Sequence, residues 1–202
     1  MTTALLQTTY FGPIQWYQKL YRYDRVFIEQ YDTYQKQTYR NRCVIATANG
    51  LQALTVPVEA AGEKCLVRDI RLSDHNQWRR VHWNALLSAY SESPFFDYYA
   101  DDIRPFFEKK YDYLVDFNEA IRQTICHLLD IQPLVTYTAD YQQQPEGVAD
   151  FRDVIHAKHP QPDADFLPRR YWQVFERKHG FQANLSVLDL LFNMGNESIF
   201  YL

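Results

Sequence analysis

The opening of the chain carries the pattern of a strand, a helix and a second strand. Residues 4–8 (Ala-Leu-Leu-Gln-Thr) predict a short strand, and Gly12 and Pro13 follow as strand-breaking residues. From Pro13 to Tyr23, apolar residues recur three and four positions apart, which predicts a helix that starts near the proline. Residues 26–28 (Val-Phe-Ile) predict a second strand. A strand, a helix and a strand in about thirty residues are typical of a βαβ unit with parallel strands.

A hairpin is predicted next. Residues 43–48 lead into an Asn-Gly dipeptide at 49–50, which favours a two-residue turn, and apolar residues alternate over 54–58. We expect this hairpin to extend the sheet. Residues 66–72 predict one further strand.

Helical periodicity dominates the rest of the chain. Asp74 and Gln77 resemble a capping box, and Ser186 with Asp189 resembles a second helix start. The predicted segments are helices over 74–89, 95–110, 113–129, 171–178 and 186–195, and a strand over 134–138.

Residues 141–169 contain several prolines and little periodicity, yet Phe151 and Phe166 punctuate them. This pattern indicates a long ordered loop or lid rather than a linker. The predicted fold class is therefore mixed α/β, in a single domain over 1–202. A small, partly parallel sheet opens with the βαβ unit, a β-hairpin follows, and four or more helices cover it.

The composition is that of an ordinary globular protein. Of 202 residues, 47% are hydrophobic and 23% are charged, which excludes collagen-like and disordered chains. No apolar run approaches the roughly 18 residues of a membrane helix, so we expect no membrane insertion. The net charge of -4 disfavours nucleic acid as the main partner. Aromatic residues make up 16%, which favours either a tyrosine-rich core or a cleft that stacks on sugars or bases.

The spacing of cysteines and histidines predicts no metal centre. Cys43, Cys65 and Cys126 form no C-x-x-C pair, which argues against a zinc ribbon or a disulfide framework. His156 and His159 have a metal-like spacing but no third ligand nearby. Glycine-rich nucleotide-binding motifs are missing, so no cofactor is expected. The N-terminus lacks the basic and apolar regions of a signal peptide, which predicts a cytoplasmic protein.

Ligands of βαβ units bind beyond the carboxyl ends of the strands. Gln7, Thr9, Tyr10, Glu29 and Gln30 are therefore expected near a site. The polar residues that follow are suited to an oxyanion, because guanidinium groups grip phosphate or carboxylate with paired hydrogen bonds. They are Lys36, Arg40, Asn41 and Arg42, with Arg152 and Lys158 as a second set on the lid. The alternative is a solvated loop whose charges balance acids such as Asp32.

His82 lies on a predicted helix, on the same face as Trp78 and Leu86. This position predicts a histidine that faces the core or a cleft within it. One interpretation is a neutral core imidazole bonded to a backbone carbonyl. The other is a general base that works near neutral pH.

Several sequence blocks together resemble the WbqC-like family. They include TTYFGPIQWYQKL, YQKQTYRNRCVI, ANGLQALTVPV, NQWRRVHWNALLSAYSESPFFDYY, DFRDVIHAKHP and YWQVFERKHGFQANLSVLDLLFNMG, in this order. The family-motif residues that carry over are Tyr10, Lys36, Asn41, Arg42, Gly50, Pro57, His82, Trp83, Asp189 and Asn193. Many members have a His-Gln-Pro-Asn-Tyr string where this chain has Leu6-Gln7-Thr8-Thr9-Tyr10, so the family's first histidine is missing here.

The resemblance implies a role in bacterial surface polysaccharide (O-antigen) synthesis, as an acyl or aminoacyl transferase of the glycine type acting on an amino sugar. His82 would be the general base. The basic residues would hold the phosphates of a nucleotide sugar or an activated acyl donor, while Asn41 and Tyr10 would orient the sugar or stabilise an oxyanion. Two alternatives stay open: a non-catalytic module that binds an anionic ligand, and a protein-partner scaffold that exposes Tyr98, Tyr99 and Phe106 together.

Overall fold

The structure is a computed structural model that describes residues 1–60, 62, 64–141, 143 and 146–202. Four strands form a parallel sheet in the order β5-β2-β1-β6. They are β1 (Thr3–Gln7), β2 (Arg25–Glu29), β5 (Val135–Tyr137) and β6 (Ala149–Asp150). Helix α1 (Ile14–Arg22) joins β1 to β2, so the predicted βαβ unit is confirmed.

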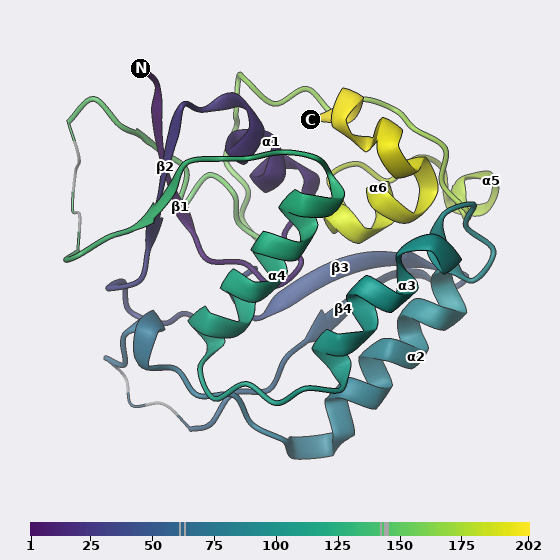
Figure 1. Cartoon of the computed structure of the whole chain (residues 1–202), viewed down its shortest axis with the longest axis horizontal. Coiled ribbons are helices and arrows are strands. Elements are labelled where there is room, and N and C mark those ends of the chain that lie inside the picture. Colours follow the sequence, from purple (N-terminus) through teal and green to yellow (C-terminus); the bar gives the residue numbers. More distant parts are fainter. Residues whose placement is uncertain (61, 63, 142, 144–145) are drawn as a thin grey trace.

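The two faces of this sheet differ in what covers them. The side chains that enter the hydrophobic core are those of Ala4, Leu6, Val26 and Ile28. Leu5 and Phe27 alternate with them and therefore point to the opposite face. In Figure 1 the helices lie to the right of the sheet, and the segment that leaves β5 lies to its left. The second face thus packs mainly against irregular chain.

The predicted hairpin is present as β3 (Arg42–Thr47) and β4 (Gly50–Thr55). The expectation that it extends the parallel sheet is wrong, because the two strands form a sheet of their own. The backbone of β3 is instead tied to the C-terminal region, since the Ser186 N–H donates to the Val44 carbonyl at 2.8 Å.

Further helices complete the fold and confirm the mixed α/β class with at least four helices. In the described residues they are α2 (Trp78–Tyr90), α3 (Phe96–Ile103), α4 (Leu114–Leu128), α5 (Glu176–His179) and α6 (Val187–Met194). Short 3-10 turns lie over 67–69, 75–77, 104–107 and 195–201. Ser186 caps α6 as predicted, because its hydroxyl accepts a hydrogen bond from the Leu188 N–H.

Three local predictions are wrong. Residues 66–72 form no strand, because their backbone groups bond to separate segments: Val67 N–H to the Asp32 carbonyl, and Leu72 N–H to the Asp112 carbonyl. The Asp74 carboxylate does not cap α2. It binds the side chains of Arg79 and Lys110 instead.

The third error concerns the helix predicted over 171–178, which is confined to α5. Residues Tyr171 and Gln173 precede α5 in non-helical backbone, and both direct their side chains to Asp189 on α6. These tertiary hydrogen bonds replace the helical bonds that the local pattern favours.

The predicted long loop is an ordered part of the fold where the structure describes it. Phe151 and Ile155 are buried in the core. The Lys19 ammonium on α1 lies 2.7 Å from the Asp163 carboxylate and 4.5 Å from the centre of the Phe151 ring. Residues 142, 144 and 145 of this loop lie outside the described residues. No helix in the described part of the chain is long and apolar enough to cross a membrane.

Candidate functional site

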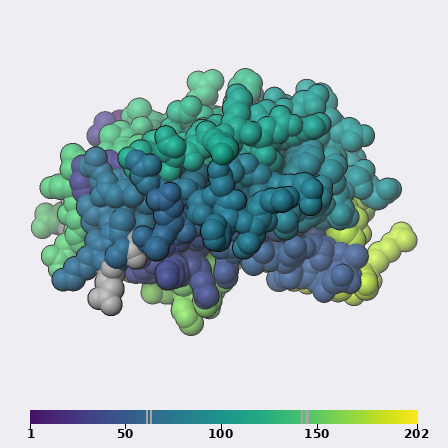
Figure 2. All heavy atoms as spheres, turned by 90° about the horizontal axis from the view of Figure 1, so that it is seen from below, coloured from purple at the N-terminus to yellow at the C-terminus, as the bar shows by residue number. Residues whose placement is uncertain are grey.

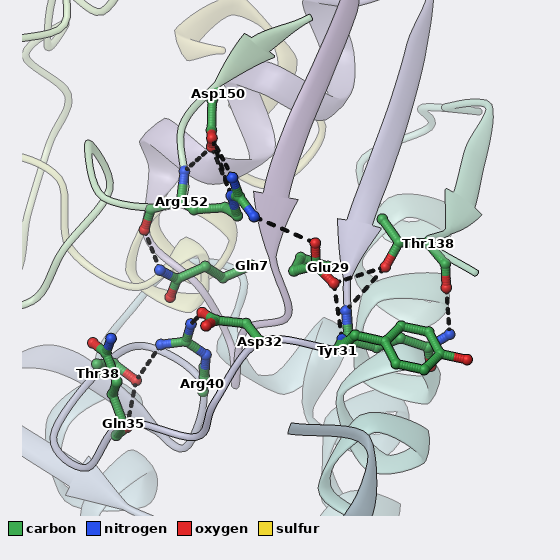
Figure 3. A network of polar contacts seen from close by, with 11 residues as sticks. Gln7, Glu29, Tyr31, Asp32, Gln35, Thr38, Arg40, Thr138, Asp150 and Arg152 are labelled. Atoms are coloured by element: carbon green, nitrogen blue, oxygen red, sulfur yellow. Dashed lines mark hydrogen bonds and ion pairs between the residues drawn. The ribbon is translucent and has the colours of Figure 1, made fainter. Parts of the chain in front are cut away.

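Polar side chains gather where the parallel strands end (Figure 3). Gln7 is the last residue of β1 and Glu29 the last of β2. Thr138 follows β5, and Arg152 follows β6. Because parallel strands have their carboxyl ends at one edge, four segments that are far apart in sequence meet here. We call this set, together with Asp150, the carboxyl-edge network.

Glu29 is the centre of the network and is almost fully buried. One carboxylate oxygen accepts hydrogen bonds from the Thr138 hydroxyl and the Tyr31 N–H, each at 2.8 Å. The other lies 3.3 Å from the Arg152 guanidinium. A buried carboxylate is tolerable only when such donors replace the water that it loses.

Arg152 is already paired with acids. Its Nε lies 3.0 and 3.1 Å from the two Asp150 oxygens, and one terminal nitrogen lies 2.6 Å from the second of them. Burial alone would lower the Arg152 pKa, but these hydrogen bonds and the Asp150 charge outweigh burial and raise it. The Arg152 carbonyl also accepts a hydrogen bond from the Gln7 side chain. The guanidinium therefore lies at the predicted edge of the sheet, where it already forms ion pairs with Glu29 and Asp150.

Arg40 behaves in the same way. It is buried, and it forms an ion pair with Asp32 and a 3.4 Å hydrogen bond to the Thr38 hydroxyl. Burial is the main cause of a lowered Arg40 pKa, which the Asp32 charge partly offsets. Figure 3 shows this pair next to Gln7. The alternative that the sequence left open was a solvated loop whose charges balance acids such as Asp32. The pairing with Asp32 is present, but Arg40 is buried rather than solvated.

The other basic residues do not converge on the network. Lys36 is exposed on the loop, and Arg42 lies on the hairpin with its Nε 3.0 Å from the Thr55 hydroxyl. Asn41 donates to the Val56 carbonyl at 2.8 Å. Lys158 does cross from the long loop, and its ammonium contacts the side chain of Gln37.

A cavity of about 490 Å³ opens beside the network, over the second face of the sheet. Leu5 and Phe27 form its floor, and Thr138 belongs both to its wall and to the network. Asp140 and Glu146 add two carboxyl groups, and none of the described lining residues is basic. An apolar floor with hydroxyl and carboxyl groups on the wall suits a ligand that carries amine and hydroxyl groups.

His82 and Tyr10 form an internal pair away from this cavity. His82 is only 4% exposed, and its Nδ1 lies 2.8 Å from the buried Tyr10 hydroxyl. Trp78 and Phe107 pack around the imidazole, with ring centres 5.2 and 6.5 Å away. Burial lowers the His82 pKa to about 4, although a hydrogen bond to the Thr55 backbone acts the other way. The imidazole is therefore neutral at pH 7 and bonded on both sides, which matches the core interpretation of its position.

Asp189 is a buried acid whose surroundings the sequence did not reveal. The interpretation of Asp189 as a helix cap is wrong, because its carboxylate accepts hydrogen bonds from side chains, three of them on other segments and one on α6 itself. The donors are Tyr171 at 2.7 Å, Tyr90 at 2.8 Å, Gln173 at 3.1 Å and Asn193 at 3.4 Å. Burial raises the Asp189 pKa, and these hydrogen bonds reduce the rise.

The aromatic patch of the scaffold hypothesis does not form. Tyr98 is exposed, but Tyr99 and Phe106 are buried in the core. Across the described ranges, no three His, Cys, Asp or Glu side chains lie close enough together to hold a metal ion.

Thr138 and Asp150 are the network members that sequence reasoning missed. Each stands at or just after the end of a short strand, and Asp150 lies two residues before Arg152. A search for polar residues at every strand end would have found Thr138. The two-residue strand β6 is too short to show any pattern.

The comparisons with known proteins agree with the resemblance in the sequence blocks. The model of the WbqC-like protein family matches residues 7–160, a range that runs from Gln7 past Arg152 and so contains the whole network. The chain is also 30% identical to the uncharacterized protein Rv1507c of Mycobacterium tuberculosis (strain ATCC 25618 / H37Rv). That alignment covers 98% of this chain and 96% of the relative. No solved structure is found to match. By the extent of the family match, this chain belongs to the WbqC-like protein family.

Proposed function

We propose that this protein is a cytoplasmic acyl or aminoacyl transferase that acts on an amino sugar, free or linked to a nucleotide or glycan, in surface polysaccharide synthesis. The observation that carries the proposal is the cavity beside the carboxyl-edge network. Its volume of about 490 Å³ lies within the roughly 300–1,000 Å³ typical of small-molecule sites. Its carboxyl groups and the absence of basic residues in its described lining favour a ligand with an amino group.

The chemistry follows from the positions of the polar groups. Transfer of an acyl group requires an uncharged amine as the nucleophile, so a nearby group must take its proton. Asp140 and Glu146 line the cavity and are placed to hold an ammonium group and to accept that proton. The Thr138 hydroxyl is fixed by Glu29 and can orient a sugar hydroxyl. Lys36 and Lys158 stand exposed on the loops that follow β2 and β6, where they can meet a phosphate-bearing donor.

A non-catalytic binding module is the second candidate, and the state of His82 favours it. The resemblance implies His82 as the general base, but the imidazole is buried away from this cavity, and its Nδ1 is bonded to the Tyr10 hydroxyl. Under this alternative the cavity holds the same amine-bearing ligand without turnover.

A binding experiment with a matched ligand pair tests the cavity. The nitrogen of glucosamine carries a charge near neutral pH, whereas the acetyl group of N-acetylglucosamine removes that charge and adds bulk. We expect wild-type protein to bind glucosamine more tightly by calorimetry, and Asp140→Asn to remove that preference. Asp116→Asn removes an exposed carboxylate on α4 and should keep the preference. Equal affinity for the two sugars would contradict the proposal. Mass spectrometry of the amino sugar after incubation with an activated acyl donor, such as acetyl coenzyme A, then separates a transferase from a binding module.

A further inference from the structure

A second cavity, of about 320 Å³, lies between the start of α2 and the 3-10 turn over 104–107. In Figure 1, α2 runs along the lower right of the molecule, whereas the parallel sheet lies on the left. Figure 2 looks at the molecule from below, and α2 and the segments that follow it cover most of that face. We call this cavity the α2 groove. The residues that give it its character are Arg79, Arg80, Arg104, Trp83, Phe107 and Glu108.

The groove carries an excess of positive charge. The Arg104 Nε lies 2.7 Å from the Glu108 carboxylate, so these two charges neutralise each other. The Asp74 carboxylate, which does not line the groove, divides its charge between Arg79 and Lys110. Arg80 has no ion pair or hydrogen bond in the described part of the chain. In the described residues, the lining of the groove therefore holds three arginines against one carboxylate, Glu108.

The arginine nearest the core is held in place before any ligand arrives. The Arg79 guanidinium lies 4.6 Å from the centre of the Trp78 ring, and its side chain is only 15% exposed. Stacking and the ion pair with Asp74 fix the orientation of its remaining N–H donors, so little conformational entropy is lost on binding. The start of the 13-residue helix α2 adds a partial positive charge at the same end. Each of these features favours an anion.

An aromatic wall stands beside the arginines. Trp83 is half-buried, and its indole packs on Phe107 at 5.7 Å and on Phe96 at 6.0 Å. Its partners hold the indole in one orientation, and its exposed part lines the groove. A planar ring of a ligand can stack on such an indole, with a contribution comparable to that of base–aromatic stacking.

We propose that the α2 groove binds a nucleoside diphosphate, with the phosphates on Arg79, Arg80 and Arg104 and the base against Trp83. Guanidinium groups match phosphate oxygens with paired hydrogen bonds, which accounts for three arginines in so small a cavity. The cavity is of a size for a small ligand. The proposal does not depend on the proposed function, because different residues form the two cavities.

Calorimetry with UDP and ADP tests the proposal, with inorganic pyrophosphate and uridine as partial ligands. Arg80→Gln is the informative variant, because it removes a cation that supports no contact in the described structure. Arg177→Gln is the matched control, since it removes an exposed arginine on α5 far along the chain. We expect at least one of the two diphosphates to bind saturably. Arg80→Gln should weaken that binding about tenfold or more, the effect of losing a charge-assisted hydrogen bond, and Arg177→Gln should not.

Tryptophan fluorescence tests whether the base stacks on Trp83. Quenching of tryptophan fluorescence on binding should be lost in Trp83→Leu, and the diphosphate should bind more weakly to this variant. Circular dichroism checks that the variant is folded. Failure of UDP and ADP to bind at millimolar concentration would overturn the proposal, and so would equal weakening by Arg80→Gln and Arg177→Gln. Pyrophosphate that binds as tightly as the nucleotides, with no effect of Trp83→Leu, would overturn the assignment to a nucleoside.

Discussion

The buried state of His82 predicts a pH dependence of stability that one substitution should remove. The folded protein holds the imidazole with a pKa of about 4, against an ordinary value of 6.5. Below pH 6.5 the unfolded chain therefore takes up a proton at this site and the folded chain does not. Protons then favour the unfolded state, so the free energy of unfolding falls as the pH drops from 6.5 to 4.

The size of this effect follows from the two pKa values. Full titration across the interval is worth about 3.4 kcal/mol, at roughly 1.36 kcal/mol for each pKa unit. At pH 5 the unfolded site is almost fully protonated and the folded site is about one-tenth protonated. The loss of stability between pH 7.5 and pH 5 is then about 2 kcal/mol from His82 alone.

Urea unfolding of wild type and His82→Gln at pH 7.5 and pH 5 measures this contribution. Glutamine cannot titrate and can still hydrogen bond with Tyr10, so the other acid-sensitive groups contribute equally to both proteins. We expect wild type to lose about 2 kcal/mol more than the variant over this interval. His75→Gln removes an exposed histidine and controls for the loss of a histidine as such. Parallel pH profiles for wild type and His82→Gln would refute the assignment of a buried neutral imidazole.

Two further predictions concern stability and are measured by urea unfolding at pH 7.5. Arg152→Met should destabilise the protein by about 3 kcal/mol, because it removes the guanidinium that pairs with the buried Glu29 carboxylate. Adding Glu29→Gln to this variant should restore part of the lost stability. A double variant no more stable than Arg152→Met would contradict this account. Gly195→Ala should cost about 3 kcal/mol, because the residue has φ = 55° and a Cβ would lie 2.6 Å from the Phe95 ring. Gly180→Ala has a positive φ but open space around it, so it should cost only about 1 kcal/mol; equal costs for the two glycines would contradict the steric argument.

The parts of the fold that local pattern determines were predictable from the sequence. The βαβ unit, the Asn-Gly hairpin, the main helices and the Ser186 cap each depend on residues close together in the chain. The strand predicted over 66–72 failed for the opposite reason. Its backbone groups bond to Asp32, Asp112 and other distant residues, so no continuous ladder forms. Where the hairpin docks depends on distant segments, as the hydrogen bond from the Ser186 N–H to the Val44 carbonyl shows, and no local pattern reports such contacts.

The sequence predicted where the candidate site lies better than it predicted which residues form it. Gln7 and Glu29 follow directly from the rule that ligands bind at the carboxyl ends of parallel strands. Thr138 and Asp150 come from strands that reach this edge only through the tertiary fold. Whether a loop side chain points inward or outward could not be predicted either, because a loop has no regular spacing of buried and exposed positions. Arg40 points inward to Asp32, whereas Lys36, four residues earlier, is exposed.

Charge pairing decides which kind of ligand fits each cavity. At the carboxyl edge, Arg152 and Arg40 are buried and already paired with Asp150, Glu29 and Asp32. An anionic ligand there must pull a guanidinium away from a partly or fully buried carboxylate, and breaking such a pair costs about 3–5 kcal/mol. That is a large part of the roughly 8 kcal/mol of a micromolar complex. The adjacent cavity instead presents the carboxyl groups of Asp140 and Glu146, which favours an amine there. The α2 groove has the reverse balance, since its described lining holds three arginines and one carboxylate. This charge balance is the common basis of the two proposals, an amine-bearing ligand at the sheet edge and a phosphate-bearing ligand in the α2 groove.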